Sequence, residues 1–176
     1  MIGYALAMSF RPTDLHDLDV AQEVRIETTA KPGEVHSTII WVVVDGGEVF
    51  VRSVRGDRGR WYREALRNPI VRIDDVGRRL EARAVPANDP QTIARVNAAF
   101  ERKYKAVDGY DAMLEPDVLG ATLKLEPLRA DEQPLEAPAY LGADEPSELD
   151  TPVEVGLLDG GPPIPENVIL QPHKPA

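Results

Sequence analysis

The sequence has no cysteine among its 176 residues, and this absence removes several kinds of chemistry at once. Disulfide bonds, thiolate metal sites and cysteine nucleophiles are all excluded. The three histidines, His16, His36 and His173, do not have the spacing of zinc ligands, which argues against a zinc site. Neither a Walker loop nor a dinucleotide-binding glycine motif is present. The sequence therefore points away from the commonest metal and nucleotide sites.

Long hydrophobic runs are absent as well. No segment approaches the ~20 consecutive apolar residues that a membrane span requires. Residues 1–10 are mildly apolar, but they lack a basic region and are followed by Arg11 and Pro12, so we expect neither a signal peptide nor a membrane anchor. Together with the missing disulfides, this favours a cytoplasmic protein with no membrane partner.

Basic residues are outnumbered, and the net charge is −10. The excess acid is concentrated in residues 129–176, which contain ten acidic residues and only two basic ones, Arg129 and Lys174. The remaining chain is nearly neutral, which argues against general affinity for nucleic acid. We expect an N-terminal extension (residues 1–20), one folded domain (residues 21–128) and an acidic tail.

The tail, residues 129–176, is also rich in proline, with nine in 48 residues, and shows no hydrophobic period. Such a composition predicts an extended or disordered segment. Part of it could dock on the chain's own folded domain or on a second copy of the protein. The alternative is that the tail serves only to increase solubility. Its short apolar stretches are residues 139–141, 155–158 and 168–170.

The folded part is predicted to be mainly β. Period-two alternation and β-branched runs indicate strands, and Asp45-Gly46-Gly47 indicates a tight hairpin turn. Helical spacing predicts helices over residues 61–67 and 90–105, the second capped by Asp89. We therefore expect a six-stranded antiparallel barrel with helices at its rim. The expected strands cover residues 24–28, 38–44, 48–54, 70–74, 79–85 and 121–126.

An arginine-rich loop is the most conspicuous candidate site. Five arginines lie between residues 52 and 63, with Gly56 and Gly59 among them and Asp57 as the single acid. Guanidinium groups match phosphate geometry, and loop amides before a helix add further donors. A phosphate cradle is one interpretation. A solvated connection whose arginines pair with surface acids is the other, and the residues alone leave both open.

Aromatic residues near this loop have a similar double interpretation. Trp41 and the pair Trp61-Tyr62 could stack on a flat ring, or they could be core or interface anchors. Phe100 and Tyr104 are spaced as core residues of a helix. His36 could lie at the rim of a cofactor.

Four segments together resemble one small family. They are TIIWVVV (residues 38–44), VFVRSV with GRWY (49–54 and 59–62), KYK (103–105) and ATLKL (121–125). The series resembles an uncharacterised bacterial group of single-domain proteins. That group is similar to the FMN-binding split barrels of the pyridoxamine 5′-phosphate oxidase type and to the deazaflavin-dependent nitroreductases. The resemblance covers residues 21–127.

The resemblance implies a split barrel that forms a homodimer and holds FMN or a deazaflavin near the subunit interface. Such a protein would be an oxidoreductase acting by hydride transfer on a small-molecule substrate. In these barrels the phosphate is held by the second and third strands and the loop that follows. The candidate cofactor-binding residues here are Thr38, Trp41, Arg52, Ser53, Arg58, Arg60 and Trp61.

A split barrel without a cofactor, acting as a binding or scaffold protein, is the competing hypothesis. The loop of residues 31–36 bears Glu34 where the nitroreductases have a basic, glycine-rich loop. No arginine lies in residues 37–44, where the oxidases use one to hold phosphate.

Overall fold

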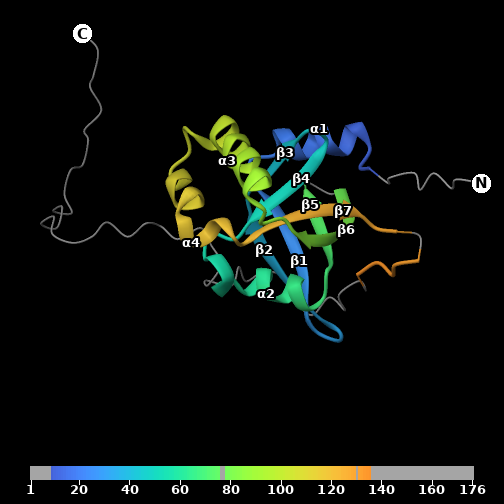
Figure 1. Ribbon diagram of the computed structural model, residues 1–176. Helices are drawn as coiled ribbons and strands as arrows, with labels where there is room; N and C mark the ends of the chain where they lie inside the picture. Colours follow the sequence, from blue (N-terminus) through green and yellow to red (C-terminus); the bar gives the residue numbers. More distant parts are fainter. Residues whose placement is uncertain (1–8, 76–77, 130, 136–176) are drawn as a thin grey trace, which may run out of the picture.

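The computed structural model describes residues 9–75, 78–129 and 131–135. Within these residues, a curled antiparallel sheet forms a half-barrel and helices lie at its periphery (Figure 1). The helices are α1 (Pro12–Val20), α2 (Arg60–Arg67), α3 (Pro90–Tyr104) and α4 (Pro116–Leu119), with short 3₁₀ turns η1 (Gly56–Arg58) and η2 (Tyr110–Leu114). The strands are β1 (Val24–Lys31), β2 (Glu34–Ile40), β3 (Val42–Asp45), β4 (Glu48–Arg52), β5 (Ile70–Asp75), β6 (Arg78–Pro86) and β7 (Thr122–Pro127).

The sheet contains seven strands in the order β2-β1-β5-β6-β7-β4-β3, so the expectation of six strands was wrong. The difference arises at Trp41, where the expected strand 38–44 is divided. Its first half belongs to β2 and pairs with β1, whereas its second half is β3 and pairs with β4. One continuous stretch of chain therefore supplies both edges of the sheet, which is how the sheet curls into a half-barrel.

The loop expected at residues 31–36 is also mostly strand. β1 continues to Lys31 and β2 begins at Glu34, so only Pro32 and Gly33 form the turn between them. Gly33 has a φ of 79°, a value that glycine adopts without strain. The hairpin places Thr28 directly opposite His36, which becomes important for the candidate site.

Two locally encoded features are confirmed. Gly46 and Gly47 both have positive φ and connect β3 to β4 as a two-residue hairpin turn. Asp89 caps α3, because its side chain accepts a hydrogen bond from the backbone N–H of Thr92 at 2.9 Å. Both features depend on a few adjacent residues, so the sequence was sufficient to predict them.

The two faces of the sheet carry separate apolar clusters, as β4 illustrates. Val49 and Val51 belong to the cluster inside the curl, together with Trp61 of α2 and Leu18 of α1. Phe50 faces the other way and belongs to the cluster beneath α3. Arg52 follows the same alternation as Phe50 and therefore lies on the α3 side.

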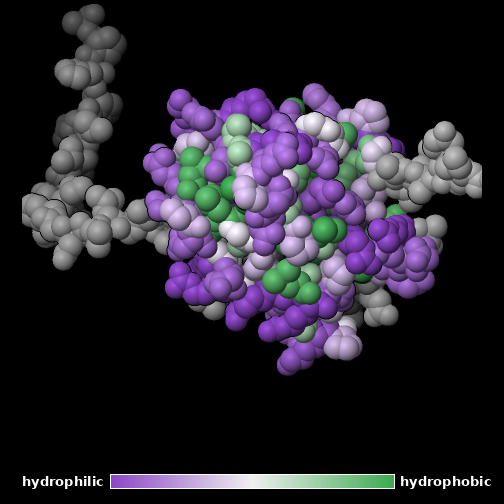
Figure 2. All heavy atoms as spheres, in the orientation of Figure 1, coloured by the Kyte–Doolittle hydropathy of each residue, from purple (hydrophilic) through white to green (hydrophobic). Residues whose placement is uncertain are grey.

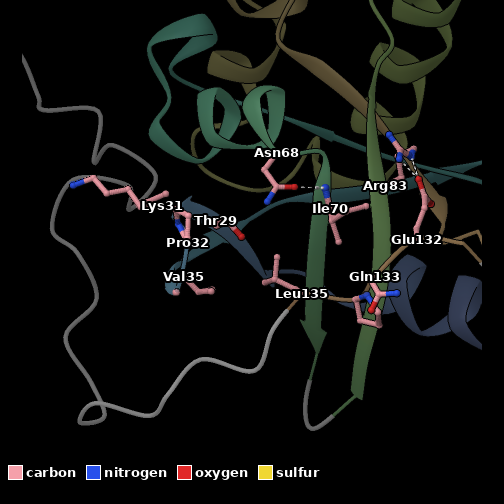
Figure 3. A pocket seen from close by; sticks show the side chains of 13 residues that line it. Thr29, Lys31, Pro32, Val35, Asn68, Ile70, Arg83, Glu132, Gln133 and Leu135 are labelled. Atoms are coloured by element: carbon pink, nitrogen blue, oxygen red, sulfur yellow. Dashed lines mark hydrogen bonds and ion pairs between the residues drawn. The ribbon is translucent and has the colours of Figure 1, made fainter.

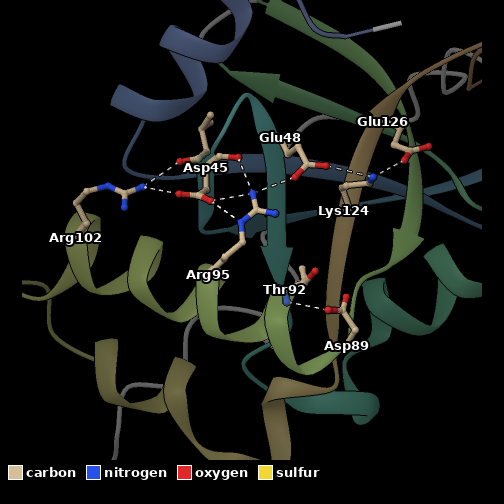
Figure 4. A network of polar contacts seen from close by, with 9 residues as sticks. Asp45, Glu48, Asp89, Thr92, Arg95, Arg102, Lys124 and Glu126 are labelled. Atoms are coloured by element: carbon tan, nitrogen blue, oxygen red, sulfur yellow. Dashed lines mark hydrogen bonds and ion pairs between the residues drawn. The ribbon is translucent and has the colours of Figure 1, made fainter. Parts of the chain in front are cut away.

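Ion pairs fasten α3 to the β3–β4 hairpin (Figure 4). Arg95 contacts Asp45 and Glu48 at 2.9 Å and 3.0 Å, and Arg102 contacts Asp45 at 3.5 Å. Lys124 of β7 extends the network to Glu48 at 3.4 Å. These groups are partly exposed, so we assign the network a modest role in orienting α3.

The first residues of the tail lie against the outer face of the sheet. Leu135 is buried, its N–H donates to Glu81, and its carbonyl oxygen accepts a 2.5 Å hydrogen bond from Arg72. Glu132 forms an ion pair with Arg83 of β6. We call residues 131–135 the arm. The apolar stretches 139–141, 155–158 and 168–170 lie outside the described residues.

The visible surface is mostly hydrophilic, with small separate hydrophobic patches (Figure 2). Among the described residues, the large hydrophobic side chains that are exposed are Val20 and Leu66. None of the helices in this part of the chain is both long and apolar enough to cross a bilayer.

Candidate ligand site between α2 and β2

Two of the candidate residues meet where the start of α2 faces β2. Nη2 of Arg60, the first residue of α2, lies 3.5 Å from Oγ1 of Thr38. Thr38 is buried inside the curl, and Arg60 is half-buried. The contact is long for a hydrogen bond, so it places the guanidinium beside the hydroxyl without binding it strongly. The structure thus brings together two residues that are 22 positions apart.

One helical turn later, Glu64 extends the same contact surface. Its buried carboxylate accepts a 2.7 Å hydrogen bond from Oγ1 of Thr28 and lies 2.8 Å from Nδ1 of His36. Residues four apart on a helix share a face, so Arg60 and Glu64 both point to the β1–β2 hairpin. We call the five residues Thr28, His36, Thr38, Arg60 and Glu64 the α2–β2 seam.

Sequence reasoning missed Glu64 and Thr28 as members of this site. The spacing of Glu64 from Arg60 was visible in the sequence, and so was the alternation of β1. What was missing was the packing of α2 across β1 and β2, which no local pattern specifies. His36, expected as a possible rim residue, lies within the seam.

The loop before α2 is tightly packed at its two glycines. Ser53 is buried, and its Oγ has no hydrogen-bond partner in the described residues. A Cβ on Gly59 would lie 2.2 Å from that oxygen, and a Cβ on Gly56 would lie 2.8 Å from the carbonyl oxygen of Asp117. Both glycines are therefore needed for close approach. Ser53 and the start of α2 lie side by side as a result.

Arg52 is placed elsewhere. Its side chain is only 1% exposed and contacts α3, η2 and β7. Burial lowers the pKa of this guanidinium to about 10. The structure therefore separates Arg52 from Thr38 and Arg60, because Arg52 lies on the α3 face of the sheet, whereas Thr38 pairs with Ile26 on the opposite face.

The two tryptophans are packing residues. Trp41 stacks face to face on Tyr104 of α3, with ring centroids 4.4 Å apart and planes inclined by 5°. Trp61 is buried inside the curl and meets Tyr62 edge-on. Arg58 is exposed on η1. Of the seven candidates, Thr38, Ser53 and Arg60 thus lie around the start of α2, with Trp61 buried beneath them.

A groove of about 760 Å³ lies near the other end of α2 (Figure 3). The turn of the β1–β2 hairpin, the start of β5 and the arm form its walls. Asn68 at its edge accepts a 3.3 Å hydrogen bond from the N–H of Ile70. None of the seven candidate residues lines it. Its lining includes Thr29, Lys31, Pro32, Val35, Asn68, Ile70, Arg83, Gln133 and Leu135.

Across residues 9–75, 78–129 and 131–135, no three His, Cys, Asp or Glu side chains are grouped so as to hold an ion.

The fold defines a half-barrel of the split-barrel type, and solved structures share it. A conserved hypothetical protein, Rv2991 of Mycobacterium tuberculosis, is 14% identical with a TM-score of 0.52, covering 71% of this chain and 84% of its own. Campylobacter jejuni ChuZ is 15% identical with a TM-score of 0.53, over 65% of this chain and 51% of its own. A putative pyridoxamine 5′-phosphate oxidase from Listeria innocua is 18% identical over 66% of this chain and 92% of its own, but its TM-score of 0.49 is too low to support the fold assignment. At these identities the likeness concerns the fold alone.

The chain belongs to a family described as uncharacterised proteins conserved in bacteria (DUF2255), whose model matches residues 14–125. The family resemblance expected from the sequence is therefore confirmed. No curated protein matches the sequence.

Proposed function

We propose that this protein binds a flavin-type cofactor, FMN or a deazaflavin, with the phosphate at the start of α2 beside Arg60 and Thr38. The observation that carries the proposal is the convergence of these two residues at a helix N-terminus. A phosphate oxygen is a better acceptor for the guanidinium than a hydroxyl 3.5 Å away. Backbone N–H groups at the first turn of α2 add donors, and the helix dipole favours an anion there.

Ser53 supports the same placement. Its buried hydroxyl has no partner in the described residues and lies beside Gly59, the residue that precedes α2. A buried hydroxyl without a partner is costly, and a phosphate at the start of α2 would supply an acceptor if the loop before the helix shifted to expose this oxygen. Arg58, exposed on η1, could add a cation at the surface. Arg52 and Trp41 are not part of this proposal, because both are engaged with α3 and its neighbours.

A bound flavin or deazaflavin would supply hydride transfer, so the protein would act as an oxidoreductase on a small molecule. The chain's own residues would bind and orient the cofactor.

The proposal includes a cytoplasmic homodimer, as the resemblance to split barrels of this type implies. Light scattering at micromolar concentration should give twice the monomer mass. A monomer mass would contradict a cofactor bound at a subunit interface.

A second function is favoured by a specific observation. Trp41, Arg52 and Trp61, which the sequence suggested as cofactor contacts, are buried in protein packing. This favours a barrel that has no cofactor and acts as a binding or scaffold protein. The groove beside the arm would then be the first surface to test for a ligand.

Fluorescence titration with FMN and with riboflavin separates the two functions, because riboflavin lacks the phosphate. Wild-type protein should bind FMN more tightly than riboflavin. Arg60→Gln should weaken FMN about 10–100-fold, since a charge-assisted hydrogen bond contributes roughly 1.5–3 kcal/mol. The same titration with a deazaflavin tests the other cofactor class.

The matched control is Arg63→Gln, which removes an exposed arginine from the same helix. It should leave FMN affinity unchanged. Equal affinity in wild type and Arg60→Gln would overturn the phosphate site. Absence of binding by every flavin and deazaflavin tested would favour the scaffold function.

A further inference from the structure

Arg52 is a buried cation whose hydrogen bonds are incomplete. A guanidinium has five N–H donors. Nε donates to Oγ1 of Thr122 at 2.8 Å, and Nη1 donates to Oδ1 of Asn97 at 2.8 Å and to the carbonyl oxygen of Met113 at 2.6 Å. Nη2 is buried and has no partner in the described residues. Both of its N–H groups are therefore unsatisfied.

Its charge is also uncompensated. Every acceptor of Arg52 is a neutral group, and no carboxylate contacts it within the part of the chain that the structure describes. Arg72, the other buried arginine, shows the usual solution. It is 4% exposed and contacts Glu27 at 2.7 Å and Glu81 at 2.5 Å. Two buried guanidinium groups in one small domain thus differ in whether a counter-charge is present.

An unpaired buried charge costs several kcal/mol, and each unsatisfied donor adds to that cost. A water molecule at Nη2 would satisfy its donors but leave the charge. An anion would do both. The ring of Phe100, 5.2 Å from the guanidinium carbon, and the packing of α3 and η2 enclose Arg52 so closely that Nη2 is inaccessible. An anion must therefore be small, and neighbouring side chains must shift to admit it.

We propose that Nη2 of Arg52 is a binding site for a small monovalent anion of the size of chloride, enclosed by β4, β7, α3 and η2. The anion would act as a structural counter-ion that ties η2 to the sheet. This site is independent of the proposed phosphate site at Arg60, which lies on the other side of the sheet.

Thermal unfolding of the full-length protein in different salts tests the proposal. Raising sodium chloride or sodium bromide from ~10 to ~200 mM should raise Tm by about 2–4 °C and then saturate, as expected for a ligand of millimolar affinity. Sodium gluconate at the same ionic strength should not, because gluconate is too large to enter. An identical rise with gluconate would overturn the proposal.

Two variants assign the effect to Arg52. Arg52→Lys keeps a positive charge but lacks Nη2, so its Tm should lose the halide dependence. Arg63→Gln, which removes an exposed arginine outside both proposed sites, should keep it. Halide dependence that persists in Arg52→Lys would refute the site.

A crystallographic measurement decides the question even if Arg52→Lys does not fold. Wild-type crystals soaked in bromide should show an anomalous peak in contact with Nη2 of Arg52. A map with no peak there, whatever ions appear on the surface, would overturn the proposal.

Discussion

His36 of β2 is held by Glu64 of α2, with Nδ1 and Oε1 2.8 Å apart although 28 residues separate the two in sequence. Glu64 is buried and also accepts a hydrogen bond from Thr28 of β1. One carboxylate therefore joins α2 to both strands of the β1–β2 hairpin. Because Arg60 begins the same helix, this contact also fixes where the candidate phosphate site lies.

Glu64→Gln should lower the free energy of unfolding by about 1–3 kcal/mol, because an amide cannot accept from Thr28 and His36 as a carboxylate does. Urea denaturation measures the loss. Glu34 is the matched control, since its Oε1 lies 3.2 Å from Nε2 of His36 but its side chain is 50% exposed. Glu34→Gln should change stability by less than ~0.5 kcal/mol. Equal losses in the two variants would contradict the role assigned to Glu64.

Gly59→Ala should destabilise the fold by about 1–3 kcal/mol, because its Cβ would lie 2.2 Å from Oγ of Ser53. Ser53→Ala removes that oxygen. In the Ser53→Ala background the same change at residue 59 should therefore cost clearly less. A double-mutant cycle in urea measures the coupling, and strictly additive losses would show that the two residues do not meet as described.

Stability should rise between pH 7.5 and 9.5 because of Lys103. Its Nζ donates to the carbonyl oxygens of Leu18 and Val42 at 2.9 Å and 2.7 Å. Burial lowers the pKa of Lys103 from 10.5 to about 8, and the negative charges of Asp19 and Asp75 offset only part of this decrease. Above pH 8 the unfolded chain keeps a proton that the folded chain releases, so the free energy of unfolding increases with pH. The neutral amine retains two N–H groups for the two carbonyls.

The expected gain is about 1–2 kcal/mol across that range, because solvent reaches part of the side chain and screens the effect. Urea denaturation at several pH values measures it. Lys103→Gln has no titratable group at this position and should therefore lack the rise. A wild-type curve that falls over this interval, or a rise that Lys103→Gln retains, would count against a buried ammonium at this position.

Removing the arm should destabilise the barrel. Truncation after Leu128 deletes the carbonyl oxygen of Leu135 that accepts from buried Arg72, and it exposes the apolar surface beneath that leucine. Truncation after Leu135 keeps both. The shorter chain should therefore unfold at lower urea concentration than the longer one, by about 1–3 kcal/mol. Equal midpoints would mean that the arm does not stabilise the sheet.

The candidate site was only partly predictable. Thr38 and Arg60 were named from the sequence, and the structure places them together. Arg52 was named with them, and the alternation of β4 already implied that it shares a face with Phe50 and not with Val51. The residues near Arg52 in the sequence do not indicate which face of the sheet α3 would cover. Glu64 and Thr28 were missed for the same reason, since their contact exists only once α2 packs on β1.

The sequence by itself determined the features that depend on near neighbours. These are the hairpin turn at Gly46 and Gly47, the cap at Asp89 and the apolar alternation of the strands, because backbone sterics and local hydrogen bonds act over a few residues. Tertiary structure alone decided that the chain would divide at Trp41 into two edge strands, because β2 and β3 take different partners. It also decided that Arg52 would be buried with no carboxylate partner among the described residues, while Arg60 reaches Thr38. Both outcomes depend on how helices cover the two faces of a curled sheet, and that packing is set by long-range burial of apolar surface, which no short window of sequence contains.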